Sequence, residues 1–307
     1  MWGLLISTLA LVSLSAACTP SVTTVSGSHA PATNWEFQYY SNNRTNSYTH
    51  HGVLHILPSL TSDQFGEAFL TSGHLNIEGG APADSARLRT VDSFSFRYGR
   101  LEVRAKMPAG DWLWPAIWLM PAHNVYGTWP SSGEIDLVES RGNRNMFSNG
   151  LHIGTQEAGS TLHFGPYPEL NGWERAHWIR RNAAGYDSSF HRYQLEWTPD
   201  YLKFSIDDVE LGRATPNIAG FWQYGGFNPN VLNPWRYGSK MAPFDQKFYL
   251  IMNVAVGGTN GFFPDGVSNP SPKPWLNSSP TNSNPIYKYH ISFWSDHCAA
   301  TRLNYCT

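Results

Sequence analysis

Three carboxyl side chains, those of Glu134, Asp136 and Glu139, lie close together in one short segment of the chain. The residues between them are apolar and of types that favour β-strands. Carboxylates are costly to place near apolar surface unless a partner or a chemical task holds them there. Two carboxyl groups that flank one bond, one of them kept protonated, are the groups that hydrolyse glycosidic bonds. The segment therefore predicts glycoside hydrolysis, with a solvated acidic strand face as the alternative.

The spacing of these carboxylates makes a structural demand. Side chains alternate between the two faces of a strand, so Glu134 and Asp136 share a face. Glu139 is an odd number of positions further on and would point the other way in a regular strand. A β-bulge between Asp136 and Glu139 would return it to the same face, and bulges are common beside active sites. The two glutamate carboxyls must then lean together, to about 5–5.5 Å for a mechanism that retains configuration.

The chemistry assigns a role to each group. One glutamate attacks the anomeric carbon as a carboxylate, and the other donates a proton to the leaving oxygen and later activates water. Asp136, which lies between them, can hydrogen-bond the nucleophile and tune the titration of the pair.

Short β segments dominate the rest of the chain. Residues 101–107 alternate apolar and polar, as do residues 193–197, and residues 201–212 predict a hairpin that turns at Asp207 and Asp208. Residues 248–256 form a continuous apolar run, which is typical of a central strand. Many short strands with Gly and Pro turns predict an all-β sandwich or jelly roll in one domain. The long irregular segments 217–245 and 257–285 are candidates for the walls of a site, or ordinary surface loops.

The ends of the chain suggest an export signal and two segments outside the core. Residues 1–17 are apolar and then small, which predicts a signal peptide and a secreted protein. Residues 18–33 form a flexible lead-in, the domain spans 34–293, and 294–307 is an atypical tail. Secretion would permit a bridge between Cys298 and Cys306, whereas free thiols at these positions and at Cys18 are the alternative.

Composition excludes several classes of function. Formal net charge is −2 and charged residues are 14% of the chain, with no basic stripe for nucleic acid. After the signal peptide no apolar run is long enough to predict a membrane span. No Cys/His cluster has metal-ligand spacing and no phosphate-binding loop is present, so we expect no metal and no cofactor. The 13 Trp residues supply rings for a Trp-rich core, and some of them could stack on sugars. We expect a monomer that binds a neutral polysaccharide.

The carboxylate segment resembles the bulged active-site motif of glycoside hydrolase family 16, the laminarinase-like endo-β-1,3-glucanases. The resemblance is to the animal members, a group that also contains β-1,3-glucan-binding proteins, and it runs from about residue 34 to about residue 293. The segments that carry it are 98–100, 111–121, 133–139, 140–143, 190–193, 196–199 and 253–258.

The resemblance implies a β-sandwich jelly roll of the concanavalin A-like type, with a concave substrate cleft. It makes Glu134 the nucleophile, Asp136 its helper and Glu139 the acid/base. The chain departs from the family at both ends: it lacks a pattern for the extra N-terminal strand and for the closing C-terminal strand. Missing strands would expose sheet edges, so stability is the property that these departures put at risk. They also put at risk a calcium site that some members build from their terminal segments.

Residues for substrate binding follow from the resemblance and from residue type. Trp114 and Trp118 are expected to border the cleft, with core packing as the alternative, and Trp112 is the expected core member of that run. Asn253 interrupts an apolar strand and must hydrogen-bond either sugar or backbone. The full set of expected substrate-binding residues is Asn42, Arg44, Trp114, Trp118, Trp129, His163 and Asn253.

Three functional hypotheses follow. The first is a secreted endo-β-1,3-glucanase that retains configuration. The second is a non-catalytic β-1,3-glucan recognition protein of innate immunity, a class that typically lacks one or both catalytic glutamates. Both glutamates are present here, which favours the enzyme. The third is a degenerate isoform that neither folds well nor acts, which the two chain ends suggest. The sequence leaves β-1,3 and mixed-linkage specificity open, and also a digestive or immune role.

Overall fold

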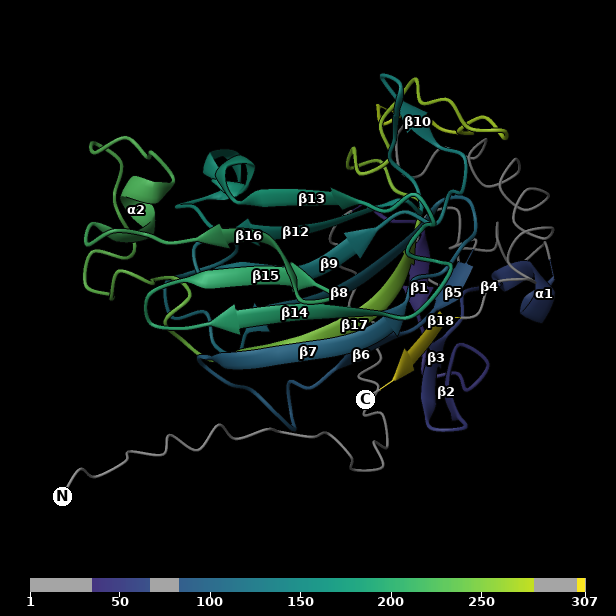
Figure 1. Ribbon diagram of the computed structural model, residues 1–307, viewed down its shortest axis with the longest axis horizontal. Helices are drawn as coiled ribbons and strands as arrows, with labels where there is room; N and C mark the ends of the chain where they lie inside the picture. Colours follow the sequence, from purple (N-terminus) through teal and green to yellow (C-terminus); the bar gives the residue numbers. More distant parts are fainter. Residues whose placement is uncertain (1–34, 67–82, 279–302, 307) are drawn as a thin grey trace.

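The structure is a computed structural model that describes residues 35–66, 83–278 and 303–306. Strands in two large sheets account for most of its regular structure, and in both sheets neighbouring strands are antiparallel (Figure 1). Among the described residues no helix is long and apolar enough to cross a membrane.

The first large sheet has six strands. Their order is β13 (His177–Arg181), β12 (Glu157–His163), β9 (Glu134–Ser140), β8 (Leu113–Pro121), β17 (Phe248–Val256) and β6 (Arg87–Arg89). The predicted central strand is thus confirmed as β17, which lies between β8 and β6. The carboxylate segment forms β9, with a neighbour on each side.

The second large sheet has seven strands. Their order is β16 (Val209–Ala214), β15 (Leu202–Ile206), β14 (His191–Trp197), β7 (Gly99–Lys106), β18 (Leu303–Cys306), β3 (Val53–Ile56) and β2 (Ser47–His50). The predicted hairpin is confirmed: Asp207 and Asp208 both have positive φ between β15 and β16, as a type I′ turn requires.

Smaller elements border the two sheets. A third sheet contains β1 (Gln38–Tyr40), β5 (Ala83–Ser85) and β4 (Ser59–Leu60), and β10 (Phe147–Ser148) pairs with β11 (Leu151–His152). The short helices are α1 (Thr61–Phe65), η2 (Pro168–Leu170), η3 (Trp173–Arg175) and α2 (Gly220–Tyr224).

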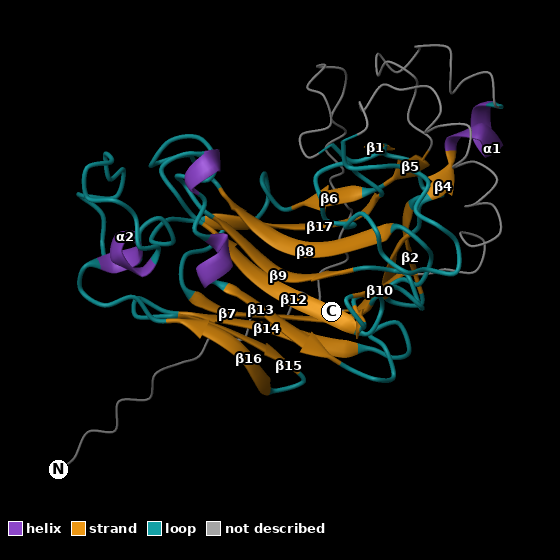
Figure 2. Cartoon of the chain, turned by 90° about the horizontal axis from the view of Figure 1, so that it is seen from above, coloured by secondary structure: helices purple, strands orange, loops and turns teal. Residues whose placement is uncertain are grey.

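The core lies between the two large sheets, which pack as a sandwich (Figure 2). Trp197 on β14 meets Phe248 on β17 with ring centroids 5.5 Å apart, and Trp178 on β13 meets Phe204 on β15 at 5.6 Å. Fully burying such side chains contributes about 1.5–3 kcal/mol each. The expected all-β sandwich is therefore confirmed, and these aromatic pairs join its two large sheets.

The C-terminal end differs from the sequence-based expectation. The sequence predicts an atypical tail without a closing strand over residues 294–307, but the backbone of Leu303–Cys306 forms β18 and pairs with β3 and β7. For these four residues the expectation is wrong, because four extended residues are enough to fill the place between two strand edges. The signal peptide, the lead-in, Cys18 and Cys298 lie outside the described residues.

Candidate active site

The three carboxylates lie on one face of β9 because the strand contains the predicted bulge. In the β8–β9 ladder Ala116 faces Glu139 and Trp118 faces Asp136, with the register shift between these pairs. The β9–β12 ladder shifts at the same place. The odd spacing between Asp136 and Glu139 is thereby absorbed, and both carboxyls point away from the core.

The residues in and directly before β9 explain where the strand begins and which of its faces is buried. Ile135 and Val138 are fully buried and anchor the opposite face of β9 in the core. Gly133, directly before Glu134, has φ of +84°, and a Cβ there would come 2.9 Å from the ring of Phe244. Only glycine meets both conditions without strain, so the approach to the first carboxylate depends on it.

Glu139 is held by an indole donor. The Nε1–H of Trp114 donates to Glu139 Oε1 at 2.8 Å. Burial raises the pKa of Glu139 above its ordinary value, and the charge of Glu134 adds to this, while a positive charge on His163, the Trp114 hydrogen bond and Arg141 oppose it. A raised pKa favours the protonated carboxyl, which is the form that a general acid needs.

Trp114 itself is packed rather than open. It is 8% exposed, and the ring of Phe262 lies parallel to it with centroids 3.9 Å apart and an interplanar angle of 7°. Arg141 covers Phe262, with its guanidinium carbon 4.2 Å from that ring's centroid. One face of the Trp114 ring is thus covered, and its indole N–H donates to Glu139, so contact of Trp114 with sugar stays a prediction.

Glu134 and Asp136 have different surroundings. Trp129 donates its Nε1–H to Glu134 Oε2 at 2.7 Å, and Trp129 is 38% exposed. Asp136 is buried, and burial raises its pKa well above the ordinary value, with the charges of Glu134 and Glu139 and a hydrogen bond to Glu134 acting in the same direction. A neutral Asp136 can donate to the Glu134 carboxylate, so the two groups can share one proton.

His163 joins this group from the neighbouring strand. It pairs with Glu134 across the β9–β12 ladder, and its Nε2 lies 3.2 Å from Asp136 Oδ2. Glu134, Asp136 and His163 each offer a polar atom within 4.8 Å of the others, which is also the spacing of metal ligands. The raised pKa of the buried Asp136 favours a neutral carboxyl, which is a poor ligand. The cluster fits proton sharing better than a metal, and the expectation of no metal stays a prediction.

A second network continues along the same face from β8 to β1. Trp118 donates its Nε1–H to Asn253 Oδ1 at 2.6 Å, and Asn253 Nδ2 donates to the hydroxyl of Tyr40 at 3.1 Å. The guanidinium of Arg87 lies 4.6 Å from the centroid of the Trp118 ring. Asn253 therefore has two side-chain partners that the sequence does not predict, and its contact with sugar stays a prediction. In the β8–β17 ladder Trp118 pairs with Ile251 and Asn253 with Ala116, so Trp118 and Asn253 are diagonal neighbours.

Asn42 and Arg44 follow Tyr40 in the turn between β1 and β2, and both are exposed. Within the part of the chain that the structure describes, neither has a hydrogen bond to a carboxylate of β9. Their role in binding stays a prediction.

Sequence reasoning missed Tyr40, Arg87 and Phe262. The sequence carries a signal only for Phe262, because it lies in segment 257–285, a candidate wall of the site. Trp112, predicted to be a core residue, is fully buried against Phe263 and Trp275.

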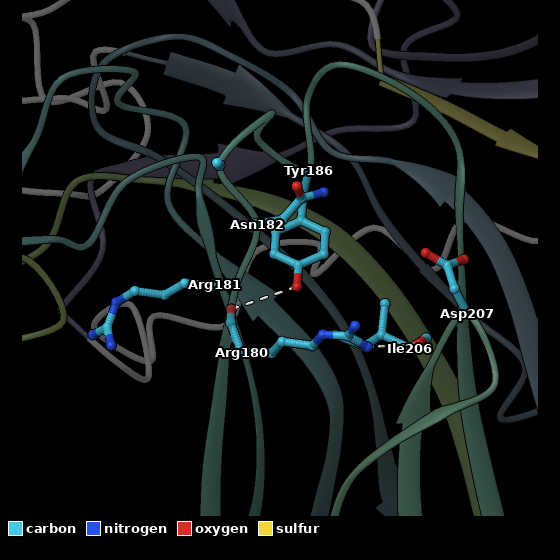
Figure 3. Close-up of a pocket in the computed structure, with 7 residues that line it drawn as sticks. Arg180, Arg181, Asn182, Tyr186, Ile206 and Asp207 are labelled. Carbon is cyan, nitrogen blue, oxygen red and sulfur yellow. Dashed lines mark hydrogen bonds between the residues drawn. The ribbon is translucent and has the colours of Figure 1, made fainter.

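A cavity elsewhere does not belong to this site. It measures about 280 Å³ and is lined by residues of β13, β15 and the loop after β13, including Arg180, Tyr186 and Asp207 (Figure 3). Its polar groups are already engaged: Arg180 donates to the carbonyl of Ile206, and Asp207 pairs with His191. No carboxylate of β9 lines it.

Comparison with known proteins places these observations in a family. Residues 59–232 match the model of "Glycosyl hydrolases family 16". The chain is 50% identical over 274 residues to a β-1,3-glucan-binding protein of Penaeus monodon, covering 81% of this chain and 73% of that protein. It is 34% identical over 225 residues to a glucan endo-1,3-β-glucosidase A1 of Niallia circulans, covering 73% of this chain but 29% of that enzyme.

A solved structure agrees with the fold. The laminarinase of Rhodothermus marinus superimposes with a TM-score of 0.59 and 28% identity, covering 91% of this chain and 85% of that one. The jelly-roll sandwich expected from the sequence is therefore confirmed.

Proposed function

We propose that this chain, which belongs to family 16 of the glycosyl hydrolases, is a secreted endo-β-1,3-glucanase that cleaves laminarin-like glucans with retention of configuration. The observation that carries the proposal is the bulge in β9, because it brings Glu134, Asp136 and Glu139 to one face with different surroundings.

The environments support a division of labour. Glu139, whose pKa is raised chiefly by burial, is the acid that protonates the leaving glycosidic oxygen. Glu134 is the nucleophile, oriented by the indole of Trp129, and forms a covalent bond to the anomeric carbon as the glycosidic bond breaks. Water then attacks that carbon while Glu139 takes its proton, and Glu134 is released as a carboxylate.

The second candidate function is glucan binding without hydrolysis. The relative that is 50% identical is named a β-1,3-glucan-binding protein, which favours this alternative directly. The presence of both glutamates favours the enzyme, since each has an indole donor in place.

Reducing-sugar release from laminarin by the purified full chain separates the two functions. Lichenan and carboxymethylcellulose serve as mixed-linkage and β-1,4 controls. Release from laminarin in excess over carboxymethylcellulose supports the enzyme. Laminarin binding by a folded protein without any release would support the binding protein and overturn the proposal.

A further inference from the structure

The side chain of Asn171 fixes the orientation of its own amide group. Its Oδ1 accepts the backbone N–H groups of Phe164 at 3.3 Å and Trp173 at 3.2 Å. Backbone N–H groups only donate, so the atom that faces them must be the carbonyl oxygen. The NH₂ group of Asn171 is therefore turned to the opposite side, where Nδ2 lies 2.8 Å from His163 Nδ1.

This arrangement determines where His163 carries its proton. An amide NH₂ has no lone pair to offer, so His163 Nδ1 must accept and carries no hydrogen. The neutral ring then has its proton on Nε2, the nitrogen that lies 3.2 Å from Asp136 Oδ2. A second proton on Nδ1 would set two N–H donors against each other, so Asn171 opposes formation of an imidazolium.

The other groups around His163 act in the opposite direction. Glu134, Asp136 and Glu139 face it from β9, and each of these carboxyls favours a charged ring only when it is ionised. On the other side, His177 of β13 is the titratable neighbour. The ring of Trp129, 5.7 Å away between centroids, carries no charge. Among the described neighbours, Asn171 is the group whose hydrogen bond leaves no place for a proton on Nδ1.

The charge of His163 matters for the acid. A cationic ring lowers the pKa of Glu139 and so favours its carboxylate, which has no proton to give to the leaving oxygen. A neutral ring removes that influence and keeps Nε2 at 3.2 Å from Asp136 Oδ2.

We propose that Asn171 is a positioning residue that holds His163 as the neutral Nε2–H tautomer, and thereby keeps Glu139 protonated for catalysis. The catalytic part of this inference rests on the proposed hydrolase function. The tautomer itself does not.

Asn171→Asp is the matched substitution. A carboxylate keeps an oxygen for the N–H groups of Phe164 and Trp173, but it accepts from Nδ1–H where the amide could only donate. We expect the variant to fold, with His163 protonated on Nδ1 as well as on Nε2 and therefore cationic.

The first readout is the ¹⁵N spectrum of the full chain with labelled histidines, in which His163→Gln identifies the resonances of His163. The wild type should show an unprotonated Nδ1 and a protonated Nε2 near neutral pH. Asn171→Asp should show a protonated Nδ1. A wild-type His163 with a proton on Nδ1, or an imidazolium at neutral pH, would overturn the inference.

The second readout is the pH dependence of kcat/KM on laminarin. In Asn171→Asp the alkaline limb should move down by about one pH unit, because a cation within a few ångström favours the carboxylate of the acid. The same change made in His163→Gln isolates the effect of the new carboxylate and should lack this downward movement. An unmoved limb in an active, folded Asn171→Asp would overturn the catalytic part.

The two readouts separate the inference from the proposed function. A wild type that shows the Nε2–H tautomer but does not hydrolyse glucan would remove the hydrolase function and leave the tautomer assignment standing.

Discussion

Trp114→Phe should move the alkaline limb of the pH–rate profile without abolishing activity. The substitution removes the Nε1–H that donates to Glu139 at 2.8 Å and keeps an aromatic ring against Phe262. A hydrogen bond to a carboxylate stabilises the ionised form and lowers its pKa. Without this donor Glu139 holds its proton to higher pH, so the limb moves upward.

The size of the effect follows from the geometry. The 2.8 Å separation lies in the range of charge-assisted hydrogen bonds. Such bonds contribute about 1.5–3 kcal/mol, and about 1.4 kcal/mol corresponds to one pH unit. The alkaline limb of kcat/KM on laminarin should therefore rise by about one to two pH units.

The matched control is Trp129→Phe, which removes the indole donor of Glu134 and leaves that of Glu139 in place. It should lower kcat without displacing the alkaline limb. If Trp114→Phe is folded and its alkaline limb stays within a few tenths of a pH unit of the wild type, Glu139 is not the acid whose titration limits the rate.

Three further variants test other parts of the site. Asp136→Asn should raise the melting temperature more at pH 8 than at pH 4. Because the pKa of Asp136 is raised in the folded state, its contribution to stability is full below the unfolded pKa of about 3.9 and is lost as pH rises, whereas Asn has no such loss. Equal shifts of the melting temperature at both pH values would refute this. Gly133→Ala should lower the free energy of unfolding by about 1–3 kcal/mol, measured with denaturant, because φ is +84° and the new Cβ would meet the ring of Phe244. An unchanged denaturation midpoint would show that the turn relaxes without cost. Phe262→Ala should reduce kcat on laminarin because it uncovers one face of the Trp114 ring. Phe94→Ala, a change at a partly exposed ring outside the site, is the control and should reduce kcat less. Equal losses of kcat in the two variants would show that Phe262 serves only in packing.

Much of the fold could be predicted because its signals are local. Alternation in β7 and β14, the apolar run of β17 and the Asp207-Asp208 turn each depend on residues that are adjacent in sequence. The bulge in β9 could be predicted because three carboxylates with one odd spacing can share a face in only a few ways.

The remainder depends on contacts between distant segments. Phe262 reaches Trp114, and Arg87 reaches Trp118, through pairings that no local pattern encodes. Asn171 in its loop resembles any capping asparagine until His163 is placed beside it. The strand β18 is short and follows residues without a clear pattern, so only the gap between β3 and β7 reveals it.

The most direct test of the central claim follows the anomeric configuration of products released from laminarin, by ¹H NMR, with wild type, Glu134→Gln and Glu139→Gln. The account predicts that the wild type releases the β-anomer first, before mutarotation. It also predicts that each variant, still folded by circular dichroism, loses activity by at least about 10²-fold. An α-anomer as first product, or near wild-type rates in either folded variant, would contradict the assignment of Glu134 and Glu139.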